Sequence, residues 1–87
     1  MVLTLSHFRV IQMTKLPQIK GDRLVNALRR KGWHVDRTRG SHVIMRHESK
    51  PETKIVVPIH RKSLKPGVLS TILKKAELSV EEVKELL

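Results

Sequence analysis

The sequence predicts a small α+β domain with the element order α-β-β-β-α. Two helices cover one face of a three-stranded antiparallel sheet, and a short extra helix ends the chain. Three observations lead to this fold class. Apolar residues recur at helical spacing in two segments. Three short runs rich in branched residues lie between these segments. The connections between the runs are short, which makes neighbouring strands antiparallel.

The first helix is expected from about Gly21 to Lys31, where basic residues in the last turn suit the negative end of the helix dipole. Gly32 is a natural stop, because glycine readily adopts the left-handed conformation that ends many helices. The residues at helical spacing are Leu24, Ala27, Leu28 and Lys31, with Val25 beside them.

Three strands follow the first helix. A turn at Gly40-Ser41 joins the first two strands, and a polar loop over residues 48–52 joins the last two. Strict alternation places Trp33, Val35 and Arg37 on one face of the first strand. The sequence leaves open which face of the second strand meets the core. The expected strands are Trp33–Thr38, His42–His47 and Thr53–Val57, the last ended by Pro58.

Pro66 and Gly67 precede a second helix, whose apolar face is predicted at residues 69–76. Ser79-Val80-Glu81-Glu82 has the pattern of a capping box and predicts a short third helix that runs to Leu87. With both long helices on one sheet face, the opposite face is free to meet a ligand. The expected core comprises Leu24, Leu28, Trp33, Val35, Ile55, Val57, Leu69, Ile72 and Leu73.

A length of 87 residues allows one small domain. Residues 1–12 show no clear period and no capping signal, and Met13-Thr14-Lys15 is typical of a bacterial protein start. We therefore expect an N-terminal extension over residues 1–12, frayed or added by a misassigned start, and a single domain over residues 13–87.

Composition excludes several classes of protein. The sequence has no cysteine, which removes disulfides, cysteine-ligated zinc and thiol nucleophiles. No apolar run approaches the roughly 20 residues that span a bilayer, and the N-terminal stretch lacks the order of a secretory signal. We therefore expect a cytoplasmic protein with no membrane partner. Phe8 and Trp33 are the only aromatic side chains, which excludes a surface that stacks several bases on aromatic rings.

The charge of the chain points to a polyanionic partner. Lys and Arg number 18 and Asp and Glu number 8, giving a formal net charge of +10. Residues 1–76 hold 17 basic and four acidic side chains, a net +13, whereas residues 77–87 hold one basic and four acidic, a net −3. Such an excess favours contact with nucleic acid. The alternative is a solvated basic surface that keeps a small protein soluble.

One segment, Arg37-Thr38-Arg39-Gly40-Ser41-His42, carries side chains suited to chemistry on phosphates. Histidine exchanges protons near neutral pH. Arginine holds a phosphate through two parallel hydrogen bonds and stabilises charge as it builds. Gly40 lets the backbone approach a ligand, and Ser41 is able to donate to a phosphate oxygen. This set suffices to cleave RNA with the substrate's own 2′-hydroxyl as nucleophile. The pattern equally fits a turn glycine followed by a strand histidine that is merely hydrogen-bonded.

The order of motifs along the chain resembles a known family. Gly40-Ser41-His42 opens an apolar strand, and the next strand ends in Val57-Pro58-Ile59-His60. A segment with the pattern Pro-Gly-X-Leu-X-X-Ile-Leu follows, within Leu64-Lys65-Pro66-Gly67-Val68-Leu69-Ser70-Thr71-Ile72-Leu73-Lys74. Together with Leu28-Arg29-Arg30-Lys31-Gly32-Trp33, these motifs are similar to those of the HicA (YcfA-like) mRNA interferases, toxins of type II toxin–antitoxin pairs. The resemblance covers residues 16–87.

The resemblance implies a fold of the double-stranded-RNA-binding-domain type and a ribonuclease activity on mRNA. It implies that His42 is the catalytic residue and that a HicB antitoxin covers the active site. Two features depart from the family pattern. Residues 1–12 are not part of it, and Trp33 stands where Phe or Tyr is usual, which should affect packing more than chemistry.

The leading hypothesis is therefore a metal-independent endoribonuclease with His42 as general acid/base. Gly40 and Ser41 shape the turn that supports the site. His60 is a candidate second acid/base or phosphate donor, or simply the start of a polar loop. The residues expected to bind RNA phosphates are Arg37, Arg39, Arg46 and Lys54, with Arg61, Lys62 and Lys65 extending the track.

No cofactor or metal site is expected. The acidic residues of the body sit singly, which argues against a two-metal nuclease. His42 and His47 lie five apart on one predicted strand and would point to opposite faces. The rival function is a non-catalytic RNA-binding or ribosome-associated module of the same fold. A DNA-binding protein is less favoured, because a three-strand meander separates the helices.

Overall fold

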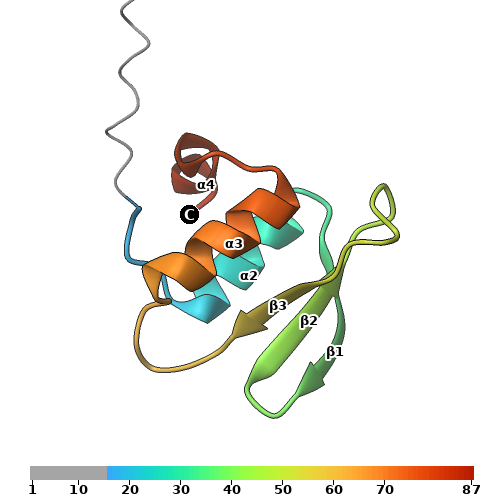
Figure 1. The fold of residues 1–87 in the computed structure, drawn as a ribbon, viewed down its shortest axis with the longest axis horizontal. Helices are drawn as coiled ribbons and strands as arrows, with labels where there is room; N and C mark the ends of the chain where they lie inside the picture. Colours follow the sequence, from blue (N-terminus) through green and yellow to red (C-terminus); the bar gives the residue numbers. More distant parts are fainter. Residues whose placement is uncertain (1–15) are drawn as a thin grey trace, which may run out of the picture.

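The computed structural model describes residues 16–87 and confirms the predicted fold class, with the element order α-β-β-β-α and a further short helix. The strands form one antiparallel sheet in the order β1-β2-β3, and the helices gather on one side of it (Figure 1). The expected extension over residues 1–12 lies outside the described residues. The elements are α2 (Gly21–Arg29), β1 (His34–Arg39), β2 (His42–Arg46), β3 (Ile55–Pro58), α3 (Pro66–Ala76) and α4 (Val80–Leu86).

Helix α2 begins at Gly21 as predicted and ends two residues before the expected Lys31. The reason is a Schellman motif, in which the Trp33 N–H donates to Leu28 O over 3.1 Å and the Gly32 N–H donates to Arg29 O over 3.1 Å. Gly32 adopts a φ of 93°, which favours glycine at this position. The motif therefore turns the chain directly from α2 into β1.

Side chains from α2, α3 and one face of the sheet form the core. In α3, Pro66 occupies the first turn rather than preceding the helix, where its missing N–H costs nothing. Val35 is only half-buried, whereas the other residues of the expected core are buried. Core residues beyond those expected are Ile19, Val25, Met45, Leu64, Ala76 and Val83.

The strand register shows which sheet face meets the helices. Met45 and its neighbour Ile55 on β3 are fully buried in the core with the helices. The next residue along β2, Ile44, does not belong to that core. Its partner on β3 is Val56, which is 37% exposed. Because alternate residues of a strand point to opposite faces, His42 shares a face with Ile44. We call this face, turned away from the helices, the open face.

A β-bulge interrupts β1 and corrects the predicted alternation. Val35 pairs with Met45, but Arg37 pairs with Ile44, so the extra residue between them is Asp36. The bulge turns Arg37 to the open face, whereas strict alternation predicted that it would share the inner face with Val35. The strand is otherwise one residue offset from the prediction, starting at His34 and ending at Arg39.

Helix α2 packs closely against the end of β3. A Cβ added to Gly21 would lie 2.1 Å from the carbonyl oxygen of Pro58, so glycine is required at this contact. Pro58 is in turn the strand partner of His42. The start of α2 is therefore held against the strand end that carries the candidate site.

The short helix α4 packs against α2 and begins with the predicted capping box. The Glu82 N–H donates to Ser79 Oγ over 3.0 Å, and the Ser79 N–H donates to Glu82 Oε1 over 2.8 Å. The bonds from Ser79, the backbone one first, lower the pKa of Glu82. A guanidinium N–H of Arg30 donates to Leu86 O and joins the end of α4 to α2. Within residues 16–87, no helix has the length and apolar character to cross a membrane.

Candidate active site

The turn between β1 and β2 places His42 at the start of its strand. Arg39 and His42 are paired across the turn, so Gly40 and Ser41 form a two-residue hairpin loop. Gly40 has a φ of 58° and Ser41 does not have a positive φ, which is the pattern of a type II′ turn with glycine at its first central position. A Cβ on Gly40 would meet nothing within 4 Å, so its backbone conformation rather than space calls for glycine.

His42 lies on the open face with two of the predicted arginines. Arg39 is its direct partner in β1, and Arg37 is paired with Ile44, the next residue of β2 on that face. Directly opposed residues of antiparallel strands have Cβ atoms about 4.5–5.5 Å apart, so the Arg39 side chain starts beside the imidazole. Arg37, Arg39 and His42 are all exposed. The Asp36 bulge is what places these arginines on the same face as His42.

His42 also opens onto a cavity of about 590 Å³ at the end of the sheet, which we call the His42 cavity. The hairpin turn and the loop that follows β3 lie at this same end (Figure 1). The Ile59 N–H donates to Ser41 O over 2.7 Å and ties the two segments together. Both cationic and apolar residues line the His42 cavity. Its lining residues are His42, Pro58, His60, Arg61, Lys62, Ser63, Leu64, Lys65 and Val68.

The basic loop over residues 60–65 is fixed by the backbone. The Leu64 N–H donates to Ile19 O over 2.8 Å, and Lys20 forms an isolated antiparallel bridge with Ser63. Leu64 itself is buried in the core. These contacts hold the cations of the loop beside His42. The structure thus brings together five of the predicted site residues, His42, His60, Arg61, Lys62 and Lys65, in one cavity.

Two of the predicted phosphate-binding residues lie elsewhere. Arg46 is at the other end of β2, about 13 Å from His42 along the strand at 3.3 Å per residue. Lys54 precedes β3, at the same far end of the sheet, where its carbonyl oxygen accepts a bond of 3.5 Å from Lys75 Nζ. It lines a separate hollow with Glu52 and Glu77. Neither cation therefore contributes to the His42 cavity.

The remaining described histidines differ from His42. His34 is exposed on the open face opposite Arg46. His47 follows β2, where its Nε2 lies 2.9 Å from Lys31 O and its Nδ1 accepts a bond of 3.0 Å from the Ser49 N–H. Its ring stands edge-on to Trp33, with the ring centroids 5.2 Å apart. His47 is thus engaged in packing.

Acidic side chains do not gather around the cavity. Within residues 16–87, no three histidine or carboxylate side chains form a group that would hold a metal ion. In the same part of the chain, the only ion pair joins Lys50 and Glu77, whose side-chain atoms are 2.9 Å apart, away from His42. The cations beside His42 are therefore free to meet an anionic ligand.

Some features of the site are absent from the predicted residue set. Pro58 and Val68 supply its apolar wall, and the Asp36 bulge orients its arginines. Pro58 lies in the Val57-Pro58-Ile59-His60 motif of the family resemblance, and that motif is the sequence signal that could have included it. No pattern in the sequence signals the bulge, because Asp36 lies in an otherwise regular alternation.

The fold and the site together define a small basic α+β domain with an exposed histidine at a cation-lined cavity. A family model described as the HicA toxin of bacterial toxin–antitoxin pairs matches residues 21–78. The chain belongs to the HicA toxin family. This membership implies an antitoxin partner. A search of curated proteins found no match.

Proposed function

We propose that the protein is the toxin of a type II toxin–antitoxin pair and acts as a metal-independent endoribonuclease on mRNA, the substrate that the resemblance to HicA toxins implies. One observation carries the proposal: His42 and His60 line the same cation-walled cavity. Two imidazoles at one cavity supply both a proton acceptor and a proton donor for cleavage of a phosphodiester.

The proposed reaction uses the 2′-hydroxyl of the RNA as nucleophile. His42 accepts the proton of that hydroxyl, and the 2′-oxygen forms a bond to phosphorus. The bond between phosphorus and the 5′-oxygen breaks, and His60 donates a proton to the departing 5′-oxygen. The products are a 2′,3′-cyclic phosphate and a 5′-hydroxyl, and the protein forms no covalent bond to the substrate.

The surrounding cations stabilise the negative charge that builds on the phosphoryl oxygens. Arg39 lies beside His42 across the turn, and Arg61, Lys62 and Lys65 line the cavity. Arginine suits this role because its guanidinium binds two phosphate oxygens at once. Gly40 and Ser41 hold the turn in the shape that keeps His42 exposed.

The antitoxin partner, which we propose to be of the HicB type, covers the His42 cavity. The net charge of +13 over residues 1–76 calls for an acidic surface on that partner. Electrostatic steering of this kind makes association fast at low salt. The association rate, measured by stopped flow between 50 and 500 mM salt, should fall steeply as salt rises, and a rate independent of salt would contradict an acidic contact surface.

The test of the proposed activity is an RNA cleavage assay on the purified protein. We expect His42→Ala to lower the cleavage rate by a factor of about 10² to 10⁴, because it removes the general acid/base. His60→Ala should lower the rate by at least about tenfold for the same reason. The wild-type products should carry 2′,3′-cyclic phosphate ends, and excess EDTA should leave the rate unchanged.

His34→Ala is the matched control, since His34 is also an exposed histidine at the start of a strand. It should cleave RNA and inhibit growth like the wild type, and all variants should bind RNA. Normal cleavage by His42→Ala would overturn the assignment of this residue. Salt-dependent RNA binding by the wild type without any product would favour the non-catalytic binding module instead.

A further inference from the structure

Beyond the His42 cavity, a basic path continues across the loop after β3 to the start of α2. The loop residues that line the His42 cavity from Arg61 to Lys65 also line a neighbouring hollow of about 550 Å³. Gln18 and Lys20, from the segment before α2, also line this hollow. A third depression, a hollow of about 450 Å³, is lined by Lys20, Ser63 and Arg23. Each of the three depressions therefore shares lining residues with the next.

Backbone contacts fix the two ends of this path relative to each other. Lys20 bridges to Ser63, and Ile19 O accepts the Leu64 N–H at 2.8 Å. Ile19 and Leu64 are both buried in the core, so the path does not depend on the conformation of a free loop. The backbone of Lys20 is therefore held beside the loop that carries the cations of the His42 cavity.

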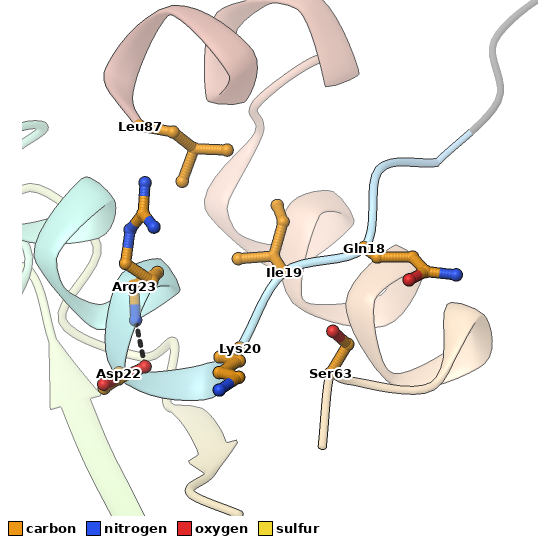
Figure 2. A pocket seen from close by; sticks show the side chains of 7 residues that line it. All are labelled: Gln18, Ile19, Lys20, Asp22, Arg23, Ser63 and Leu87. Atoms are coloured by element: carbon orange, nitrogen blue, oxygen red, sulfur yellow. Dashed lines mark hydrogen bonds between the residues drawn. The ribbon is translucent and has the colours of Figure 1, made fainter. Parts of the chain in front are cut away.

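The end of the path at α2 is cationic and accessible. Figure 2 shows Lys20 and Arg23 around the hollow, with Ser63 facing them from the loop. Both cations are exposed, and neither takes part in the single ion pair formed within residues 16–87. Asp22 is the one acidic side chain that lines the three depressions, and its Oδ1 accepts the Arg23 N–H at 2.8 Å. The three loop cations, Arg61, Lys62 and Lys65, do not line the hollow that contains this carboxylate.

We propose that Lys20 and Arg23 form a distal phosphate-binding subsite for a single RNA strand whose scissile phosphate lies at His42. The proposal rests on the proposed ribonuclease function and extends its substrate to a strand that spans both sites. A single strand is able to follow the three depressions around the loop after β3, because its backbone bends freely. A positively charged groove that tracks the backbone is the usual device for binding single strands. A stiff A-form duplex presents its phosphates on a convex surface instead.

The experiment measures binding rather than cleavage, in a His42→Ala background that leaves the RNA intact. Fluorescence anisotropy gives the dissociation constants for labelled single-stranded RNAs of 3 to 12 nucleotides. The variant Lys20→Ala/Arg23→Ala is compared with Arg29→Ala/Lys31→Ala. The control pair removes the same two charges from the last residue of α2 and the turn that follows it, outside the three depressions.

We expect the shortest RNAs to bind both variants equally and the long RNAs to bind Lys20→Ala/Arg23→Ala about tenfold more weakly than the control. Loss of two phosphate contacts should also make the slope of log K against log salt shallower by about 1.4, because each contact with a single strand contributes about 0.7. Thermal melting of both variants confirms that each is folded. The length at which the two variants diverge measures the span between the subsites.

Three outcomes would overturn the distal subsite. Equal weakening by both pairs would show that only the total charge matters. Equal weakening at all lengths would place Lys20 and Arg23 at the primary site. Unchanged RNA binding combined with weaker binding of an acidic antitoxin would assign these cations to the partner. If the wild type cleaves no RNA and the length-dependent difference persists, the ribonuclease function fails while the single-strand subsite stands.

Discussion

The two ends of β2 carry histidines in contrasting surroundings. His42, at the start of the strand, is exposed, and its ring has no hydrogen-bond partner within residues 16–87. His47, just past the end, has both ring nitrogens occupied and its ring against the buried Trp33. The Ser49 N–H donates to Nδ1, so the proton of the neutral ring is on Nε2 and is donated to Lys31 O. The two residues are five positions apart and have different surroundings.

The comparison shows that residue type alone does not identify a chemical histidine. An imidazole that exchanges protons with a substrate needs at least one ring nitrogen free to reach it. His47 has none, and its bonds instead connect the end of α2 to the segment after β2. Within residues 16–87, no partner is bonded to either ring nitrogen of His42, and cations line the same cavity. The same type of side chain therefore stabilises the fold at one end of the strand and faces an open cavity at the other.

The largest loss of stability at the His47 end is expected from Gly32→Ala. A Cβ at this position would lie 2.6 Å from His47 Nε2, and the φ of 93° is unfavourable for any residue with a side chain. We expect a loss of about 2–3 kcal/mol of unfolding free energy, from the left-handed conformation together with the displaced His47 contacts. Urea unfolding measures this loss, and an unchanged midpoint would show that His47 moves aside at no cost.

His47→Ala should have a smaller effect on the same contact. It removes a hydrogen bond to Lys31 O and an edge-on aromatic contact, worth about 1–2 kcal/mol together. The cleavage rate of the folded variant should stay within about twofold of the wild type, because His47 does not line the His42 cavity. His34→Ala, which removes an exposed imidazole, provides the baseline. A large loss of activity with normal stability would contradict the contrast between the two ends.

The smallest expected change in stability concerns α4. The hydrogen bond from Arg30 to Leu86 O joins this helix to α2 near the His47 end. Bonds from Ser79 lower the pKa of Glu82, so the unfolded chain binds protons there more readily than the folded one. The stabilisation is therefore present above the ordinary pKa of 4.5 and is lost as pH falls through the lowered value.

Glu82→Gln should accordingly melt slightly below the wild type at pH 7, and the difference should shrink as pH falls below 4.5. Glu81→Gln is the matched control, since Glu81 lies in the same first turn and takes no part in the capping box. A difference that does not shrink as the pH is lowered would rule out the charge of Glu82 as its source.

The elements of this fold follow closely from local sequence signals. Spacing of apolar residues located α2 and α3, and the capping box located α4, because each depends on neighbours three or four positions away. The strands were located to within two residues at each end. The face of β2 that carries His42 was not predictable, because both faces of this strand hold a buried residue, Ile44 and Met45.

The site was predicted as a set of residue types rather than as an arrangement. His42, Gly40 and Ser41 followed from a local turn motif. Arg46 and Lys54 were grouped with His42 on charge alone, and the register places them at the other end of the sheet. The path to Lys20 depends on its bridge to Ser63, a contact between residues 43 positions apart that no local pattern reveals.

Trp33 is the only tryptophan of the chain, and it lies buried at the His47 end. Its fluorescence is therefore a built-in optical reporter of that end alone. Emission recorded during a titration with RNA would stay constant while a ligand fills the His42 cavity, and would shift only when the packing around the indole opens. A single cuvette could thus separate loss of binding from loss of structure, with no label attached to the protein.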